Sequence, residues 1–173
     1  MKVLIACEES QEVCKAFRAK GHEAYSCDID PCTGGHPEWH IQKDVLQVIY
    51  DGWDLMIAHP PCTRLTNAGA RWMKVPPKGK TLVQMWKELF EGADFYKALR
   101  DAPINMKCIE NPIMHCHARE LIVPGHRQVV QPWWFGEETF KATGFELIGL
   151  PDLIATNKLV IPFKGTDKHK AWS

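Results

Sequence analysis

Short apolar runs alternate along the chain with segments in which apolar residues recur at helical spacing. The early runs predict strands, each followed by polar or loop-forming residues, at 3–7, 23–28, 40–44, 54–58 and 105–110. Between the first two runs, Ser10 is expected to cap a helix that continues through Lys20 and stops at Gly21. The apolar periodicity of residues 81–99 predicts a long helix, which Pro103 closes.

The alternation of strands and helices predicts an α/β fold. Because strands joined through a helix pair in parallel, the sheet should be mostly parallel, with helices on both faces. Residues 74–80 have the Lys, Pro and Gly content of a loop, and the runs at 128–131, 145–150 and 159–163 could supply further strands. The length of 173 residues suits a single domain over 1–173.

The amino-acid composition excludes few classes of function. Lys plus Arg and Asp plus Glu are equal at 21 each, so no overall field attracts nucleic acid. The seven cysteines contain no Cys-x-x-Cys pair, as expected for reduced thiols in the cytoplasm. No signal peptide pattern or membrane-spanning apolar run is present in the sequence, so no membrane partner is expected. His115, Cys116 and His117 could ligate a metal, but adjacent residues rarely form a zinc site, and no metal is expected.

The clearest chemical signal is the end of the run at 54–58, where His59, Pro60, Pro61 and Cys62 follow. Proline fixes φ and cannot continue a strand, so Cys62 is placed on a rigid loop at the carboxyl edge of the sheet, where open α/β sheets bind ligands. A thiol held in this way suits a nucleophile. A small buried cysteine in a tight turn is the alternative.

Acidic residues stand at the ends of other predicted strands. Asp28, Asp44 and Glu110 would line the same edge of the sheet as Cys62. Carboxylates at the tips of the second and third strands are well placed to accept hydrogen bonds from a ribose and an adenine amino group. Each acid alone is also a common cap or turn residue.

Taken in order, these motifs resemble the S-adenosylmethionine-dependent DNA cytosine-5 methyltransferases, and the chain looks closest to their small phage-encoded relatives. The resemblance implies a Rossmann-like methyltransferase fold, S-adenosyl-L-methionine as cofactor, and action on DNA in a bacterial or phage-infected cytoplasm. The segments that carry it are Val3-Leu-Ile-Ala, Asp28-Ile-Asp-Pro, Asp44, Ile57-Ala-His-Pro-Pro-Cys62-Thr63, Asn67-Ala-Gly69 and Ile109-Glu-Asn-Pro112.

The resemblance also implies roles for individual residues. Cys62 would be the nucleophile, Glu110 would hold the cytosine, and Asp28 and Asp44 would bind the ribose and the adenine of the cofactor. Basic residues after Cys62 could follow a phosphate backbone or simply be solvated. The sets that we expect are catalytic Cys62, Glu110 and Asn111; cofactor-binding Ala6, Glu8, Ser10, Asp28, Ile29, Asp44, Pro60 and Pro61; and substrate-binding Arg64, Asn67 and Arg71.

The chemistry explains why a cysteine and an acid belong together. Carbon 5 of cytosine is a poor nucleophile, and reversible addition of a thiolate at carbon 6 turns the ring into an enamine that can attack a methyl sulfonium. Glu110 could assist by donating a proton at ring nitrogen 3, if its environment raises its pKa. The base must leave the helical stack to reach such a pocket, unless the substrate is single-stranded DNA or a nucleotide.

Departures from the family pattern keep alternatives open. The segment Cys7-Glu8-Glu9-Ser10 replaces a glycine-rich loop. Glu8 or Glu9 could bind the cofactor's amino group while amides near Ser10 meet its carboxylate, or the acids could simply favour the first turn of a helix. No separate target-recognition domain is expected within 1–173, so a protein partner or an oligomer would have to supply that role. An amino-directed methyltransferase, acting on N4 of cytosine or N6 of adenine, is one alternative; a non-catalytic module that binds nucleic acid or protein is another.

Overall fold

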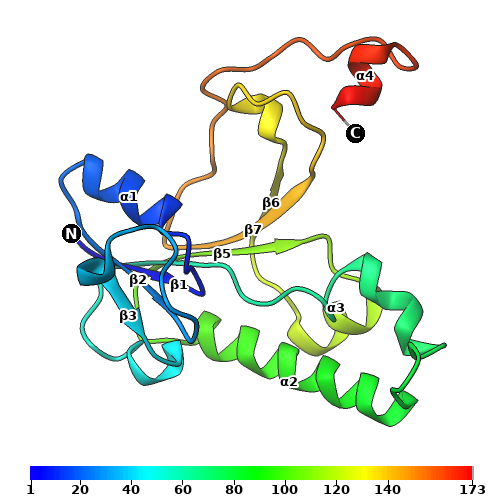
Figure 1. The fold of residues 1–173 in the computed structure, drawn as a ribbon, viewed down its shortest axis with the longest axis horizontal. Helices are drawn as coiled ribbons and strands as arrows, with labels where there is room; N and C mark the ends of the chain where they lie inside the picture. Colours follow the sequence, from blue (N-terminus) through cyan, green and yellow to red (C-terminus); the bar gives the residue numbers. More distant parts are fainter. Residues whose placement is uncertain (173) are drawn as a thin grey trace.

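One sheet of seven strands organises the part of the chain that the structure describes, which is residues 1–172 without the side chains of residues 111 and 112. The computed structural model orders the strands β3-β2-β1-β4-β5-β7-β6 (Figure 1). Strands β1 to β5 pair in parallel, whereas β7 is antiparallel to both β5 and β6. The bounds are β1 Lys2–Ala6, β2 Glu23–Asp28, β3 His40–Gln42, β4 Leu55–Ala58, β5 Met106–Pro112, β6 Arg127–Val130 and β7 Thr143–Ile148.

Helices cover both faces of this sheet. Helix α1 (Glu12–Ala19) lies on one face beside β1 and β2, and α2 (Leu82–Arg100) and α3 (Cys116–Ile122) lie on the other (Figure 1). A short helix, α4 (Asp167–Ala171), comes near the end of the chain. The predicted α/β class is confirmed: the sheet is mostly parallel and carries helices on both faces. Short 3-10 segments occupy Pro37–Trp39, Val45–Gln47, Asn67–Met73 and Pro132–Trp134.

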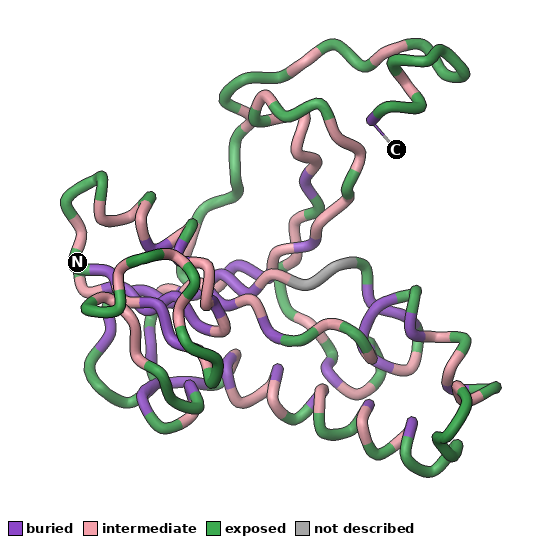
Figure 2. The backbone as a smooth tube through the Cα atoms, in the orientation of Figure 1, coloured by how far each residue is buried: buried purple, intermediate pink, exposed green. Residues whose placement is uncertain are grey.

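Alternate residues of the central strand β1 enter two different apolar layers. Val3 and Ile5 pack in a cluster with Cys14 of α1, whereas Leu4 and Ala6 enter the larger cluster that includes α2. Both faces of β1 are therefore removed from water, which is why its sequence is a continuous apolar run. Figure 2 shows burial concentrated in the strands between the helices, while the chain after β7 is mostly exposed.

Helix α1 begins later than the sequence suggested. The residue before it is Gln11, whose backbone is left-handed at φ 60°, so the expectation that Ser10 caps the helix is wrong. The carboxylate of Glu8 instead accepts hydrogen bonds from the backbone N–H groups of Val13 at 2.6 Å and Cys14 at 3.2 Å. Since these amides have no partner within the helix, Glu8 performs the capping role.

One expected strand does not form. Residues 159–163 are not in a strand; the N–H of Leu159 bonds to the carbonyl of Trp133, and Phe163 is 89% exposed. Helices α3 and α4 were not anticipated, because they are too short for their apolar residues to show a helical period. The remaining expected strands lie close to their predicted positions.

The start of α2 gives a stability prediction. The Thr81 hydroxyl accepts a hydrogen bond from the Gln84 N–H, and the Gln84 side chain accepts one from the Thr81 N–H. We expect Thr81→Ala to lower the free energy of unfolding by about 1 kcal/mol in urea denaturation. Thr81→Ser keeps the hydroxyl and should lose less than half of that amount; equal losses for the two variants would contradict the capping role.

Candidate active site

The carboxyl ends of β4 and β5 bring a histidine and a glutamate together. These strands are parallel and pair Ala58 with Ile109, so the next residue of each strand, His59 and Glu110, emerges at the same level of the sheet edge. His59 Nδ1 lies 2.6 Å from Glu110 Oε2. Because an ionised carboxylate only accepts, the proton of this hydrogen bond is on Nδ1.

A cleft of about 460 Å³ lies beside this pair. Cys62 is half-buried and lines it together with Glu110, so the structure brings the two principal predicted catalytic residues to one cavity. Asn111, the third, follows in β5, and its side chain lies outside the described part of the chain. The full lining is His59, Pro60, Pro61, Cys62, Thr63, Glu110 and Lys141.

Backbone hydrogen bonds hold the loop that carries Cys62. Its carbonyl accepts from the N–H groups of Leu65 at 2.9 Å and Thr66 at 3.1 Å, which closes a tight turn. The N–H of His115 donates to the Leu65 carbonyl, and the ring Nε2 of His115 lies 2.7 Å from the Arg64 carbonyl. The loop after Cys62 is therefore fixed to the segment that follows β5.

Of the three predicted substrate-binding residues, one is largely buried in an ion pair and two are exposed. Arg64 donates through Nε to Glu88 Oε2 of α2 at 2.6 Å and is largely buried, so its guanidinium anchors the loop. Asn67 and Arg71 are exposed, with the Arg71 guanidinium 4.1 Å from the centre of the Trp72 ring. The arrangement leaves Asn67 and Arg71, but not Arg64, accessible to a large substrate.

The pKa of Glu110 lies below its ordinary value, whereas donation of a proton to the substrate would require a raised pKa. The hydrogen bond from His59 is the main cause that lowers the pKa of Glu110, with smaller contributions from the charges of His59 and Lys141, against an opposing effect of burial. The condition for proton donation, that the surroundings raise the pKa of Glu110, is therefore not met in this structure. Nearby on β5, burial and the charge of Glu110 raise the pKa of Cys108 to about 12, so Cys108 stays a thiol.

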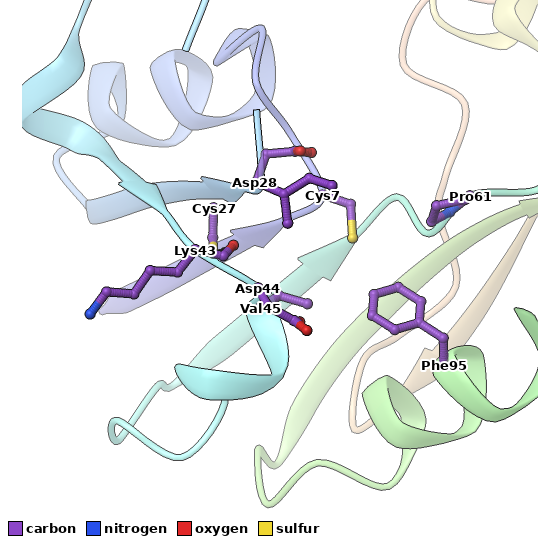
Figure 3. Close-up of a pocket in the computed structure, with 9 residues that line it drawn as sticks. Cys7, Cys27, Asp28, Lys43, Asp44, Val45, Pro61 and Phe95 are labelled. Carbon is purple, nitrogen blue, oxygen red and sulfur yellow. Dashed lines mark hydrogen bonds between the residues drawn. The ribbon is translucent and has the colours of Figure 1, made fainter. Parts of the chain in front are cut away.

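A second cavity, of about 290 Å³, lies at the ends of β1, β2 and β3 (Figure 3). It brings together four predicted cofactor residues, Asp28, Ile29, Asp44 and Pro61. Figure 3 shows Phe95 and Pro61 on the side of the cavity opposite Asp28. Pro61 lines both cavities, so the carboxylate-rimmed cavity and the Cys62 cleft adjoin at this residue. The residues that sequence reasoning missed in this cavity are Cys7, Cys27, Lys43, Val45 and Phe95.

Cys7 occupies the position where a glycine would be expected. Its backbone is left-handed at φ 59°, and its sulfur points into the cavity (Figure 3). A non-glycine residue in this conformation is strained by about 1 to 2 kcal/mol. Burial, followed by the charge of Asp28, raises the pKa of Cys7 to about 12, and burial raises that of Cys27 to about 11. Both side chains are therefore neutral thiols.

The other expected cofactor residues do not line this cavity. Ala6 is fully buried in β1, and Pro60 lines only the Cys62 cleft. Glu8 is 5% exposed and its carboxylate already accepts from the amides of α1, while Ser10 does not reach the cavity lining. The N-terminus of α1 is thus occupied by a side chain of the protein itself.

Residues 1–172 hold neither a cluster of metal-ligating side chains nor a helix that could span a membrane. No group of three or more His, Cys, Asp or Glu side chains is arranged to hold a metal ion there. His115 is buried, and its Nδ1 accepts from the N–H of Ala118 at the start of α3. Over the same residues, no helix has the length and apolar character needed to cross a bilayer.

Comparison with known proteins finds similarity only among solved structures. No family model and no curated protein matches the chain. A proposed DNA modification methyltransferase encoded within an E. coli prophage aligns with a TM-score of 0.49 and 12% identity, covering 84% of this chain and 45% of that one. The Dnmt2 methyltransferase of S. pombe aligns with a TM-score of 0.48 and 12% identity, covering 88% and 50%. The chain spans about half the length of these structures, and at this level of similarity the chemistry has to be argued from its own residues.

The His59–Glu110 contact predicts a pH dependence of stability. Because the pKa of Glu110 in the folded protein is below its ordinary value of 4.5, its carboxylate stabilises the fold above that pH, and the contribution is lost as the pH falls through the lowered pKa. We expect Glu110→Gln to flatten the loss of unfolding free energy below about pH 5, measured by urea denaturation. Glu120→Gln, at an exposed position, is the control and should leave the slope unchanged. Identical slopes for wild type and Glu110→Gln would contradict the assignment.

Proposed function

We propose that this protein transfers a methyl group from S-adenosyl-L-methionine to carbon 5 of cytosine in DNA, with Cys62 as the nucleophile. The observation that carries the proposal is the presence of Pro61 in the lining of two cavities, one rimmed by Asp28 and Asp44 and the other containing Cys62 and Glu110. A methyl donor and a pyrimidine must lie side by side for transfer, and this arrangement offers one cavity for each.

The smaller cavity has groups that suit a nucleoside. Asp28, which is half-buried at the end of β2, would accept hydrogen bonds from the ribose hydroxyls, and Asp44 would accept from the adenine amino group. Ile29 and Phe95 offer apolar surface to the flat base. The lining holds only the positive charge of Lys43 beside two carboxylates, which suits a cationic ligand. Bound there, S-adenosyl-L-methionine would supply an electrophilic methyl group.

In the larger cleft, Cys62 would act on the pyrimidine. Its sulfur would add to carbon 6 as a thiolate, forming the S–C6 bond and making carbon 5 nucleophilic. Two preceding prolines and the turn closed on the Cys62 carbonyl limit the motion of this side chain, so little entropy is lost on reaching the transition state. Glu110 would hold the base at ring nitrogen 3 and the exocyclic amine, and Lys141 would meet an oxygen of the substrate.

DNA is the proposed substrate, and the exposed side chains of Asn67 and Arg71 are candidates to contact it. A base in duplex DNA would have to leave the stack to enter the cleft. A protein partner or a second copy of the chain would supply further DNA contacts. This dependence would show as activity that rises with the concentration of the protein or with an added partner.

A second candidate function is methyl transfer to an exocyclic amine, N4 of cytosine or N6 of adenine. The lowered pKa of Glu110 favours it, because an ionised carboxylate accepts a hydrogen bond from an amino group without having to take up a proton first. The Pro60–Pro61 pair followed by a polar residue at a strand end also resembles the loop of that group. Cys62 would then be dispensable.

Cofactor binding is tested by calorimetry with S-adenosyl-L-methionine and its demethylated product. We expect Asp28→Asn to weaken binding about 10- to 100-fold, because a charge-assisted hydrogen bond contributes about 1.5 to 3 kcal/mol. Asp30→Asn, two residues away and outside the cavity lining, is the matched control and should bind as the wild type does. Absence of binding by the wild type would overturn both enzymatic proposals and favour a non-catalytic module.

The nucleophile is tested with DNA in which cytosine is replaced by 5-fluorocytosine, in duplex and single-stranded form. The reaction contains S-adenosyl-L-methionine: once the methyl group is on carbon 5, fluorine cannot leave as a proton would, so the thiolate cannot be expelled and the protein remains bound to the base. We expect a covalent conjugate with the wild type and with Cys116→Ser, an exposed cysteine elsewhere, and none with Cys62→Ser. Methyl transfer that survives Cys62→Ser would instead support the amino-directed reaction.

A further inference from the structure

We propose that His59 is a positioning residue for the reaction: it holds one oxygen of Glu110, leaves the other for the substrate, and sets the pH range in which Glu110 donates its proton. This inference rests on the proposed function and adds to it a residue that is not among the expected catalytic residues.

The contact follows from the strand register. Ala58 and Ile109 are paired neighbours of parallel strands, so the next positions in the two chains lie side by side without any special loop. The 2.6 Å separation of His59 Nδ1 and Glu110 Oε2 is short for a hydrogen bond between a nitrogen and an oxygen. Both side chains are about one quarter exposed, at 26% and 28%, so solvent screens the pair only in part.

The second ring nitrogen of His59 takes no part in this contact. Its Nε2 is buried and has no hydrogen-bond partner in the structure. Nδ1 therefore makes the polar contact of the ring, and it donates its proton to Oε2 of Glu110.

With Oε2 held in this way, the remaining oxygen of Glu110 serves the substrate. In the proposed step Glu110 carries a proton on Oε1; as the Cys62 sulfur bonds to carbon 6, this proton moves to ring nitrogen 3 and leaves a carboxylate. The Nδ1–H of His59 stabilises that carboxylate and is itself unchanged. After methyl transfer, the proton on nitrogen 3 returns to Glu110, and loss of the carbon 5 proton to water expels the Cys62 thiolate from carbon 6, so the step balances.

The charged and titratable groups around Glu110 give the sign of the pH effect. His59 faces it from the end of β4, Lys141 from the segment before β7, Cys62 across the cleft, and Cys108 lies two positions earlier on β5. His59 and Lys141 both favour the carboxylate, so the protonated form is populated only toward acidic pH. Removing the His59 hydrogen bond should extend the protonated form to higher pH.

The test compares wild type, His59→Ala and His59→Asn, whose amide N–H can replace the Nδ1–H but cannot titrate. The Glu110 carboxyl carbon is followed by NMR titration, and the rate of conjugate formation on 5-fluorocytosine DNA is measured over the same pH range. We expect His59→Ala to move both the titration midpoint and the pH profile to higher pH and to lower the maximal rate roughly 10- to 100-fold. His59→Asn should restore most of the rate, and cofactor affinity should be unchanged in both variants.

The outcomes separate this inference from the function on which it rests. The inference is overturned if the titration midpoint of Glu110 is the same in His59→Ala as in the wild type. It is also overturned if the midpoint moves but the pH profile of the conjugation rate does not, since the contact would then be purely structural. A wild type that binds no cofactor and forms no conjugate overturns the proposed function and the catalytic role of His59 together.

Discussion

The site depends on the parallel register of β4 against its two neighbours. Ala58 pairs with Ala6 of β1 on one side and with Ile109 of β5 on the other, so β1 and β4 end at the level of Ile109. The cavity near Asp28 and the cleft near Cys62 both open at this edge. A shift of the β4–β5 pairing by one residue would turn the side chains of the shifted strand to the opposite face and separate His59 from Glu110.

The backbone couples the nucleophile loop to the strand that carries the acid. Thr66 forms an isolated bridge with Met114, and the N–H of Asn67 bonds to the carbonyl of Ile113, so the chain after Cys62 runs beside the chain after Glu110. Gly69 permits the return, because a Cβ at this position would collide with the carbonyl oxygen of Thr63. The separation of the two functional groups is thus maintained by the hydrogen bonds that stabilise the fold.

Sequence reasoning reached most of the fold because the core strands are buried on both faces and leave continuous apolar runs. It also placed Cys62, Glu110, Asp28 and Asp44 at one edge, since the carboxyl ends of parallel strands share an edge. Phe95 was not among the expected site residues, because a residue on the apolar stripe of a helix looks the same whether it meets the sheet or borders a cavity.

Side-chain contacts between residues that are far apart in the sequence explain where the predictions from the sequence differ from the structure. Arg64 resembled a phosphate contact because its partner, Glu88, is far away in sequence and its charge is neutralised only after folding. The pKa of Glu110 could not be anticipated for the same reason, since His59 reaches it only through the pairing of two strands. The role of Glu8 as a cap became visible only with the left-handed backbone of Gln11, a conformation that glycine would more usually provide.

The charges in the Cys62 cleft show how a lowered pKa of Glu110 is compatible with the proposed chemistry. In the resting site the negative charge lies on Glu110, and Lys141 supplies a positive charge in the same lining. Moving the thiol proton of Cys62 to Glu110 yields the thiolate and the carboxylic acid that the reaction requires, at unchanged net charge. The cleft can therefore hold a single negative charge throughout. The charge lies on the Glu110 carboxylate before the substrate arrives and on the Cys62 sulfur when Cys62 reacts. The hydrogen bond from His59 favours the form with the charge on Glu110.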